Sequence, residues 1–159
     1  MSNSDHMPRC NLKTAIYIMA LAALPACASL SGGPTGVVNG KLQPCPPGPH
    51  CVSSDEPRVE FRIAPLKVAG DAAAAWRGLR THLASLPRTE IVDASDDYLR
   101  ATVTSRLLRF TDDVEFLLRA DLGEIAMRSS SRLGYYDFGV NRERLESIRA
   151  ALRAQQLTK

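Results

Sequence analysis

The sequence predicts an α+β domain, in which an antiparallel four-stranded meander has one helix before it and one after it, both packed on one face of the sheet. Two observations indicate this fold. Apolar residues recur at helical spacing in two segments, and between these segments they alternate with polar residues in four shorter ones. The expected order is therefore α-β-β-β-β-α, within one domain that spans residues 45–159.

The first helix is expected from Asp71, a favourable N-cap, to about Leu86, where Pro87 ends it. His82 falls beside the apolar stripe of this helix, so we expect a solvated surface histidine rather than a catalytic base. The stripe has a 4-3-4-3 spacing and consists of Ala72, Trp76, Leu79, Leu83 and Leu86.

Four strands follow, over residues 89–94, 98–110, 112–119 and 124–131. A four-residue loop, Ala120–Gly123, would join the last two strands and would fix their register. Apolar side chains then share one face, and charges on the other face are complementary. The facing pairs are Arg119 with Glu124, Leu118 with Ile125, Phe116 with Met127, Glu115 with Arg128 and Asp113 with Ser130.

Glu115 is expected to form structural ion pairs across three strands. If Phe110 and Thr111 make the turn before its strand, Arg106 faces Glu115 from one side and Arg128 faces it from the other. A slip of one residue would move every apolar side chain to the wrong face, so the agreement is informative.

The last helix is expected from Asn141 to Ala154, with Asn141 as its N-cap. Val140, just before the helix, would pack on Leu145 as a hydrophobic staple. The buried stripe of this helix would consist of Leu145, Ile148 and Leu152.

Residues 1–26 are typical of an export signal. Arg9 and Lys13 precede an apolar run, Ala15–Leu24, which is too short to span a bilayer comfortably. Either Met1 or Met7 could be the start of this signal. The run ends in Leu-Pro-Ala-Cys, which resembles the lipobox of bacterial lipoproteins.

That resemblance implies cleavage before Cys27 and attachment of lipid to it. It also implies the outer membrane, on its periplasmic side, because Ala28 rather than Asp follows. Residues 27–44, rich in Gly, Ser and Pro, would then be a flexible tether. The alternative is an ordinary secretory signal, which would leave the chain soluble in the periplasm or secreted.

An exported chain reaches an oxidising compartment, so its remaining cysteines are expected to be paired. Cys45 and Cys51 enclose three prolines and a glycine in "CPPGPHC", and a disulfide between them is the favoured interpretation. A metal site made of Cys45, His50 and Cys51 is the alternative. It lacks a fourth ligand, and the adjacent His50 and Cys51 cannot easily turn to one ion, so no metal is expected.

Charge and motifs exclude several functional classes. The formal net charge is +3 and no basic stripe or tail occurs, so nucleic acid is not an expected partner. No cofactor is expected, because the sequence has no phosphate-binding loop, metal-binding helix or dinucleotide fingerprint. After the signal only His50 and His82 remain, and neither lies in a context that resembles a catalytic triad.

Three stretches, "CPPGPHCVSSDEP", "RFTDDVEFLLR" and "RSSSRLGYYDFGVNRERLESIRAAL", resemble the bacterial family known as domain of unknown function 1499. The resemblance covers roughly Pro44 to Leu152. It implies no activity, only that such proteins are often small, exported and sometimes anchored by lipid.

The strongest candidate for a binding site lies where the fourth strand passes into the last helix. A helix N-terminus presents free N–H groups, and Arg132 and Arg142 add guanidinium groups that could bind a phosphate, a carboxylate or a sugar acid. Alternatively, these arginines pair with Asp112, Asp113 or Asp137, and the segment is structural. The candidate residues are Asp113, Ser130, Ser131, Arg132, Asp137, Asn141 and Arg142.

These features predict an envelope lipoprotein with a non-catalytic domain that binds a partner protein or a small anionic ligand. One alternative is a hydrolase or transferase that uses Ser130 or Ser131 with Arg132 and Asp137. Another is a purely structural component of the envelope.

Overall fold

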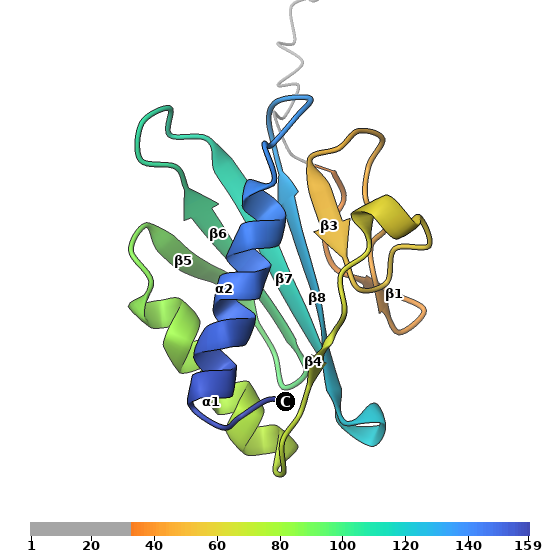
Figure 1. Ribbon diagram of the computed structural model, residues 1–159, viewed down its shortest axis with the longest axis vertical. Coiled ribbons are helices and arrows are strands. Elements are labelled where there is room, and N and C mark those ends of the chain that lie inside the picture. Colours follow the sequence, from red (N-terminus) through yellow and green to blue (C-terminus); the bar gives the residue numbers. More distant parts are fainter. Residues whose placement is uncertain (1–32) are drawn as a thin grey trace, which may run out of the picture.

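The computed structural model describes residues 33–159, and these form an α+β domain with both helices on one face of a mostly antiparallel sheet (Figure 1). The fold class is therefore confirmed, but the sheet has six strands rather than the predicted four. The helices and strands of the domain are β1 (Val37–Val38), β2 (Lys41–Leu42), β3 (Cys51–Ser53), β4 (Leu66–Lys67), α1 (Ala72–Ser85), β5 (Thr89–Ala94), β6 (Tyr98–Thr104), β7 (Thr111–Arg119), β8 (Glu124–Ser131) and α2 (Val140–Ala154).

The two additional strands lie along the outer edge of β8. The predicted meander gives the order β8-β7-β6-β5, and both β3 and β4 pair antiparallel with β8. They are three and two residues long, which is too short for alternation to show in the sequence. They satisfy the backbone groups of an edge that would otherwise be open to another strand.

The predicted register of β7 and β8 is confirmed in every pair, including Glu115 with Arg128 and Asp113 with Ser130. The turn between them ends at Gly123, whose φ of 60° is a left-handed conformation that glycine adopts without strain.

The predicted register of β6 and β7 is wrong, because β6 ends at Thr104 and residues 105–110 form a loop. The loop closes through Ser105, whose N–H donates to the Phe110 carbonyl at 2.8 Å and whose hydroxyl accepts from the Phe110 N–H at 2.9 Å. As a result Arg100, not Arg106, faces Glu115. The shift of six residues is even, so each side chain of β6 keeps its predicted face.

The α1 helix begins as predicted, with the Asp71 side chain accepting from the N–H groups of Ala73 and Ala74. The predicted start of α2 is wrong by two residues, since its N-cap is Gly139 at a φ of 82°. Asn141 is inside the first turn. Val140 is exposed, so the predicted staple with Leu145 does not form.

The sheet separates two cores. The larger one lies between the sheet and both helices, and it includes Phe116, Met127, Leu79 and Leu145. The smaller one lies on the opposite face, where Leu42 packs on Leu117, Ala126 and Tyr98. Because Leu42 belongs to the β1–β2 hairpin, the described part of the proposed tether contains a hairpin that packs on the sheet through Leu42.

Residues 1–32 are not described, so the export signal and Cys27 lie outside the described residues. Within residues 33–159, no helix is long and apolar enough to cross a membrane.

Candidate functional site

The predicted site residues do not converge on one surface, because successive residues of a strand point to opposite faces of the sheet. Ser131 lies on the face covered by α2, where Asn141 donates to its hydroxyl. Ser130 and Asp113 lie on the other face, which also carries the Glu115–Arg128 pair. The structure therefore divides all the candidates except Arg142 into two clusters with a sheet between them.

Asn141 is the centre of the cluster on the helix face and is completely buried. Its side-chain amide donates to the His50 carbonyl at 3.0 Å, the Ser131 hydroxyl at 2.9 Å and the Asp137 carboxylate at 2.8 Å. Its amide oxygen accepts from the Ser129 hydroxyl at 2.5 Å. One side chain thus joins β8, the loop before β3 and the start of α2.

Arg144 completes this cluster. Its guanidinium donates to the Asp112 carboxylate at 2.6 Å, to the Asn141 oxygen at 2.7 Å and to the Ser129 hydroxyl at 2.9 Å. Asp137 caps α2, since its carboxylate accepts from the N–H groups of Gly139 and Asn141. The free N–H groups that suggested an anion site are therefore partly satisfied by the chain itself.

On the opposite face, Arg132 forms a two-pronged ion pair with Asp113. Its Nε and Nη2 atoms each lie 2.8 Å from a carboxylate oxygen, and Arg100 donates to the same carboxylate at 3.3 Å. The hydrogen bonds that Arg132 donates to Asp113 raise the pKa of the arginine, against the opposing effect of burial. Asp113 is 4% exposed, so this carboxylate is engaged rather than presented to a ligand.

Glu115 and Arg128 form the predicted ion pair, and both side chains are fully buried. Glu115 also accepts from the Tyr98 hydroxyl at 2.8 Å and from the Gly36 N–H at 2.6 Å. Burial, followed by the charge of Glu115, raises the pKa of Tyr98 well above its usual value. Arg106 takes no part in the pair, because it lies exposed in the loop after β6.

Arg142 does not join either cluster. Its Nη2 atom donates to the carbonyl oxygens of Glu60 at 3.1 Å and Arg62 at 2.9 Å, and so holds the segment before β4 against α2. The Ser130 hydroxyl differs from the other candidate groups, because it is buried without a hydrogen-bond partner among the described residues.

The Cys45–Cys51 disulfide is present, as predicted. Because both sulfurs are bonded to each other, neither is a free thiolate that could bind a metal with His50. The Glu56 carboxylate accepts from the Cys45 N–H at 3.0 Å and from the Arg58 guanidinium at 2.6 Å. The hydrogen bond from Arg58 is the main reason that the pKa of Glu56 is lowered.

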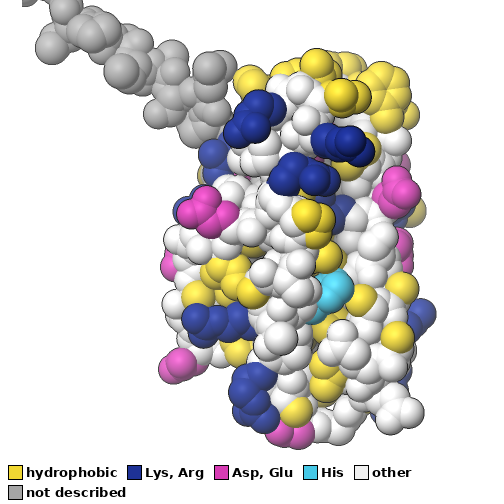
Figure 2. Space-filling model, turned by 90° about the vertical axis from the view of Figure 1, so that its left-hand side faces the viewer, with side chains coloured by type: hydrophobic (Ala, Val, Ile, Leu, Met, Phe, Trp, Pro, Cys, Tyr) yellow, Lys and Arg dark blue, Asp and Glu magenta, His cyan; other side chains and the backbone are white. Residues whose placement is uncertain are grey.

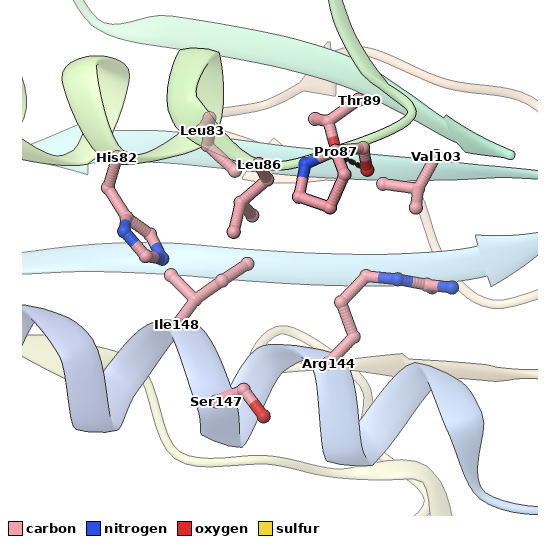
Figure 3. A pocket seen from close by; sticks show the side chains of 9 residues that line it. All are labelled: His82, Leu83, Leu86, Pro87, Thr89, Val103, Arg144, Ser147 and Ile148. Carbon is pink, nitrogen blue, oxygen red and sulfur yellow. Dashed lines mark hydrogen bonds between the residues drawn. The ribbon is translucent and has the colours of Figure 1, made fainter.

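An apolar groove lies between the end of α1 and the middle of α2 (Figure 3). Its volume is about 220 Å³. Leu86 and Pro87 follow α1, Ile148 comes from α2, and these side chains point toward one another. The remaining lining residues are His82, Leu83, Thr89, Val103, Arg144 and Ser147.

Sequence reasoning did not identify this groove, nor Arg144 and Glu56 as the charges that hold the loops. The helix ending at Pro87 and the stripe containing Ile148 were both visible in the sequence. Their approach is a tertiary contact, however, which no short motif reveals. His82, which the sequence predicts to be solvated, lies half-buried at the rim of this groove.

The comparisons agree with the landmarks in the sequence. A family model described as a protein of unknown function (DUF1499) matches residues 41–152. No curated protein and no solved structure matches the chain.

Proposed function

Because the chain belongs to the DUF1499 family, whose description gives no activity, we propose a function from the candidate site and from the amino-terminal sequence: a lipid-anchored, non-catalytic binding domain of the bacterial envelope. One observation carries the non-catalytic part of the proposal. The polar side chains of the most distinctive segment, from Ser129 to Arg144, are largely bonded to other groups of the protein. The hollow between α1 and α2, in contrast, is lined mainly by apolar side chains.

The groove between α1 and α2 is the proposed binding surface. Its volume of about 220 Å³ is below the ~300–1,000 Å³ typical of small-molecule pockets, but one or two apolar side chains would fit. Its one arginine, Arg144, already forms an ion pair with Asp112. We therefore favour a partner protein that inserts an apolar side chain over a small anionic ligand.

A hydrolase or transferase is the weaker candidate. Ser130 and Ser131 are on opposite faces of the sheet, so they cannot share a base, and Asp137 is occupied as a helix cap. Arg132 is held by Asp113 at a distance of 2.8 Å. The buried Ser130 hydroxyl, which has no hydrogen-bond partner among residues 33–159, is the observation in favour of this alternative.

The lipid anchor is tested by growing cells that produce the full chain with a radioactive fatty acid. We expect label on the wild type and none on Cys27→Ser. Absence of label on the wild type, or equal label on both, would end this part of the proposal.

The groove is tested by photo-crosslinking in living cells, with a photoreactive amino acid placed at Ser147 on the rim of the groove. The same substitution at Arg153, which is exposed elsewhere on α2, is the matched control. We expect a discrete crosslinked product from position 147 only. In addition, Ser147→Trp should fill the groove and remove any partner that co-purifies, whereas Arg153→Trp should not. Equal products from both positions would contradict the proposal.

A further inference from the structure

One end of the domain exposes a group of large apolar side chains that the groove does not explain. They come from the loop between β6 and β7 (residues 105–110) and the loop between β8 and α2 (residues 132–139). Figure 2 shows hydrophobic side chains gathered at one end of the molecule, with Lys and Arg side chains close to them. We call this surface the apolar tip; its exposed members are Leu107, Leu108, Phe110, Leu133, Tyr135, Tyr136 and Phe138.

The exposure of the tip is extreme for side chains of this size. Leu107 is 89% exposed, Phe138 is 86% exposed and Tyr135 is 78% exposed. A contiguous apolar patch on a soluble domain marks a surface that meets another molecule. The two loops are adjacent, since the Arg132 N–H donates to the Thr111 carbonyl at 3.2 Å. Tyr136 and Phe138 pack edge to face with ring centroids 5.1 Å apart, so part of the tip is preformed.

The charges around the tip are cationic. Arg106 and Arg109 are exposed in the first loop, and neither forms an ion pair with any residue from 33 to 159. The one carboxylate of the two loops, Asp137, is turned back to cap α2. Aromatic and aliphatic side chains flanked by arginines are the composition that enters the interface of an anionic bilayer.

The described chain begins at the same end of the domain. A Cβ atom placed on Gly33 would lie 3.2 Å from Pro46, which is next to the Cys45–Cys51 disulfide. Cys51 in turn pairs with Ser130 at the end of β8, from which the second loop projects. Gly33 is six positions after Cys27, so a lipid on Cys27 is within roughly 20 Å of this end.

From these observations we propose that the apolar tip docks into the surface of an anionic phospholipid bilayer, so that the domain stands on the membrane with the turn between β7 and β8 at the end farthest from it. The direction of approach rests on the lipid anchor of the proposed function; the affinity of the tip for lipid does not. Tyr135 and Phe138 enter the interfacial region, and Arg106 and Arg109 contact the phosphates.

The test places a tryptophan in each loop of the full chain, as Leu107→Trp and Phe138→Trp, and reconstitutes each variant in vesicles of anionic lipid with brominated acyl chains. The natural Trp76, the only tryptophan of the sequence, lies in α1 and serves as the internal control. We expect bromine to quench most of the fluorescence that each new indole adds, and to leave the wild-type signal from Trp76 nearly unchanged.

A charge reversal tests the role of the arginines. Arg106→Glu together with Arg109→Glu should lower the quenching at position 138, because each basic residue contributes about fivefold to binding of an anionic surface. Arg77→Glu together with Arg80→Glu is the matched control on exposed positions of α1, and it should leave the quenching unchanged. Equal effects of the two double variants would contradict the assignment of these contacts.

The outcomes separate the two proposals. If the chain takes up fatty acid but the new indoles are quenched no more than Trp76, tip docking is wrong and the anchor stands. If the indoles are quenched in a chain without fatty acid, docking stands and the anchor is wrong. A blue shift without bromine quenching, in a chain that sediments as a dimer, would identify the tip as a contact between protein copies and would overturn the proposal.

Discussion

At the scale of single residues, Asn141 shows how much of the fold depends on one buried amide. Its contacts reach three separate segments, and each partner would lose a hydrogen bond if the amide were removed. A buried polar group that is left without a partner costs about 1–3 kcal/mol, so several such groups add to a large loss.

We therefore expect Asn141→Ala to lower the free energy of unfolding by about 3 kcal/mol or more. Glu143→Ala, on an exposed position of the same turn, should change it by less than about 0.5 kcal/mol. Chemical denaturation of both variants measures the difference. A stable Asn141→Ala variant would mean that water takes over these bonds.

Glu56 gives the domain a defined dependence on pH. Its folded pKa is lowered by the hydrogen bond from Arg58, so the charged form stabilises the fold above the unfolded pKa of about 4.3. That contribution is lost as pH falls through the lower, folded pKa.

Accordingly, Glu56→Gln should cost about 1–3 kcal/mol at pH 7, where the wild-type carboxylate is charged in both states. The difference in free energy of unfolding between the wild type and Glu56→Gln should become smaller below about pH 4. Denaturation curves measured from pH 7 to pH 2.5 test this. If the difference in free energy of unfolding stays constant from pH 7 to pH 2.5, the charge of Glu56 does not stabilise the fold.

At the scale of elements, the β7–β8 hairpin illustrates what the sequence can specify. Alternation, complementary charges and a glycine at the end of a short loop all favour one register, and that register is the one observed. The β6–β7 hairpin shows that alternation and complementary charges can also fit a wrong register, since Arg106 and Arg100 both suit the position opposite Glu115. The alternation of apolar and polar residues continues past Thr104 into the loop, although the strand ends there. Hydrogen bonds between Ser105 and Phe110 close the loop at this position.

The candidate site was predictable only in part, for similar reasons. The separation of Ser130 from Ser131 follows directly from the period of a strand. In contrast, the contact of Asn141 with the His50 carbonyl joins positions 91 residues apart, and no local pattern indicates it. The groove and the two short strands at the edge of β8 are tertiary features of the same kind.

The two possible registers of β6 make different predictions for Arg106. In the structure it is exposed, so Arg106→Ala should change the free energy of unfolding by less than about 0.5 kcal/mol. Arg128→Met should cost about 3–5 kcal/mol, because it leaves Glu115 buried and without its ion-pair partner.

The double variant Arg128→Met with Glu115→Leu should recover much of that loss, since it removes both buried charges. Thermal and chemical denaturation of the four proteins measure these differences. A large effect of Arg106→Ala would support the register in which Arg106 faces Glu115.

At the scale of the whole molecule, the disulfide fixes the segment that covers the outer edge of β8. It closes a loop with a sequence separation of 6 and lies at the start of β3. A short loop of this size contributes about 2 kcal/mol by restricting the unfolded chain.

Reduction should therefore lower the free energy of unfolding by about 2 kcal/mol and leave the main sheet folded. Circular dichroism during denaturation, with and without a thiol reductant, measures the change. A variant with both Cys45→Ala and Cys51→Ala should match the reduced wild type and should not respond to the reductant. Complete unfolding on reduction would show that the loop also positions the sheet.

The first and last described residues lie at opposite ends of β8. Gly33 is near Pro46, beside the end of that strand, whereas the Lys159 N–H donates to the carbonyl of Lys67, which pairs with Glu124 at its beginning. The eight residues of β8 span about 26 Å. The sheet therefore holds the first and the last described residues apart by about the length of one strand.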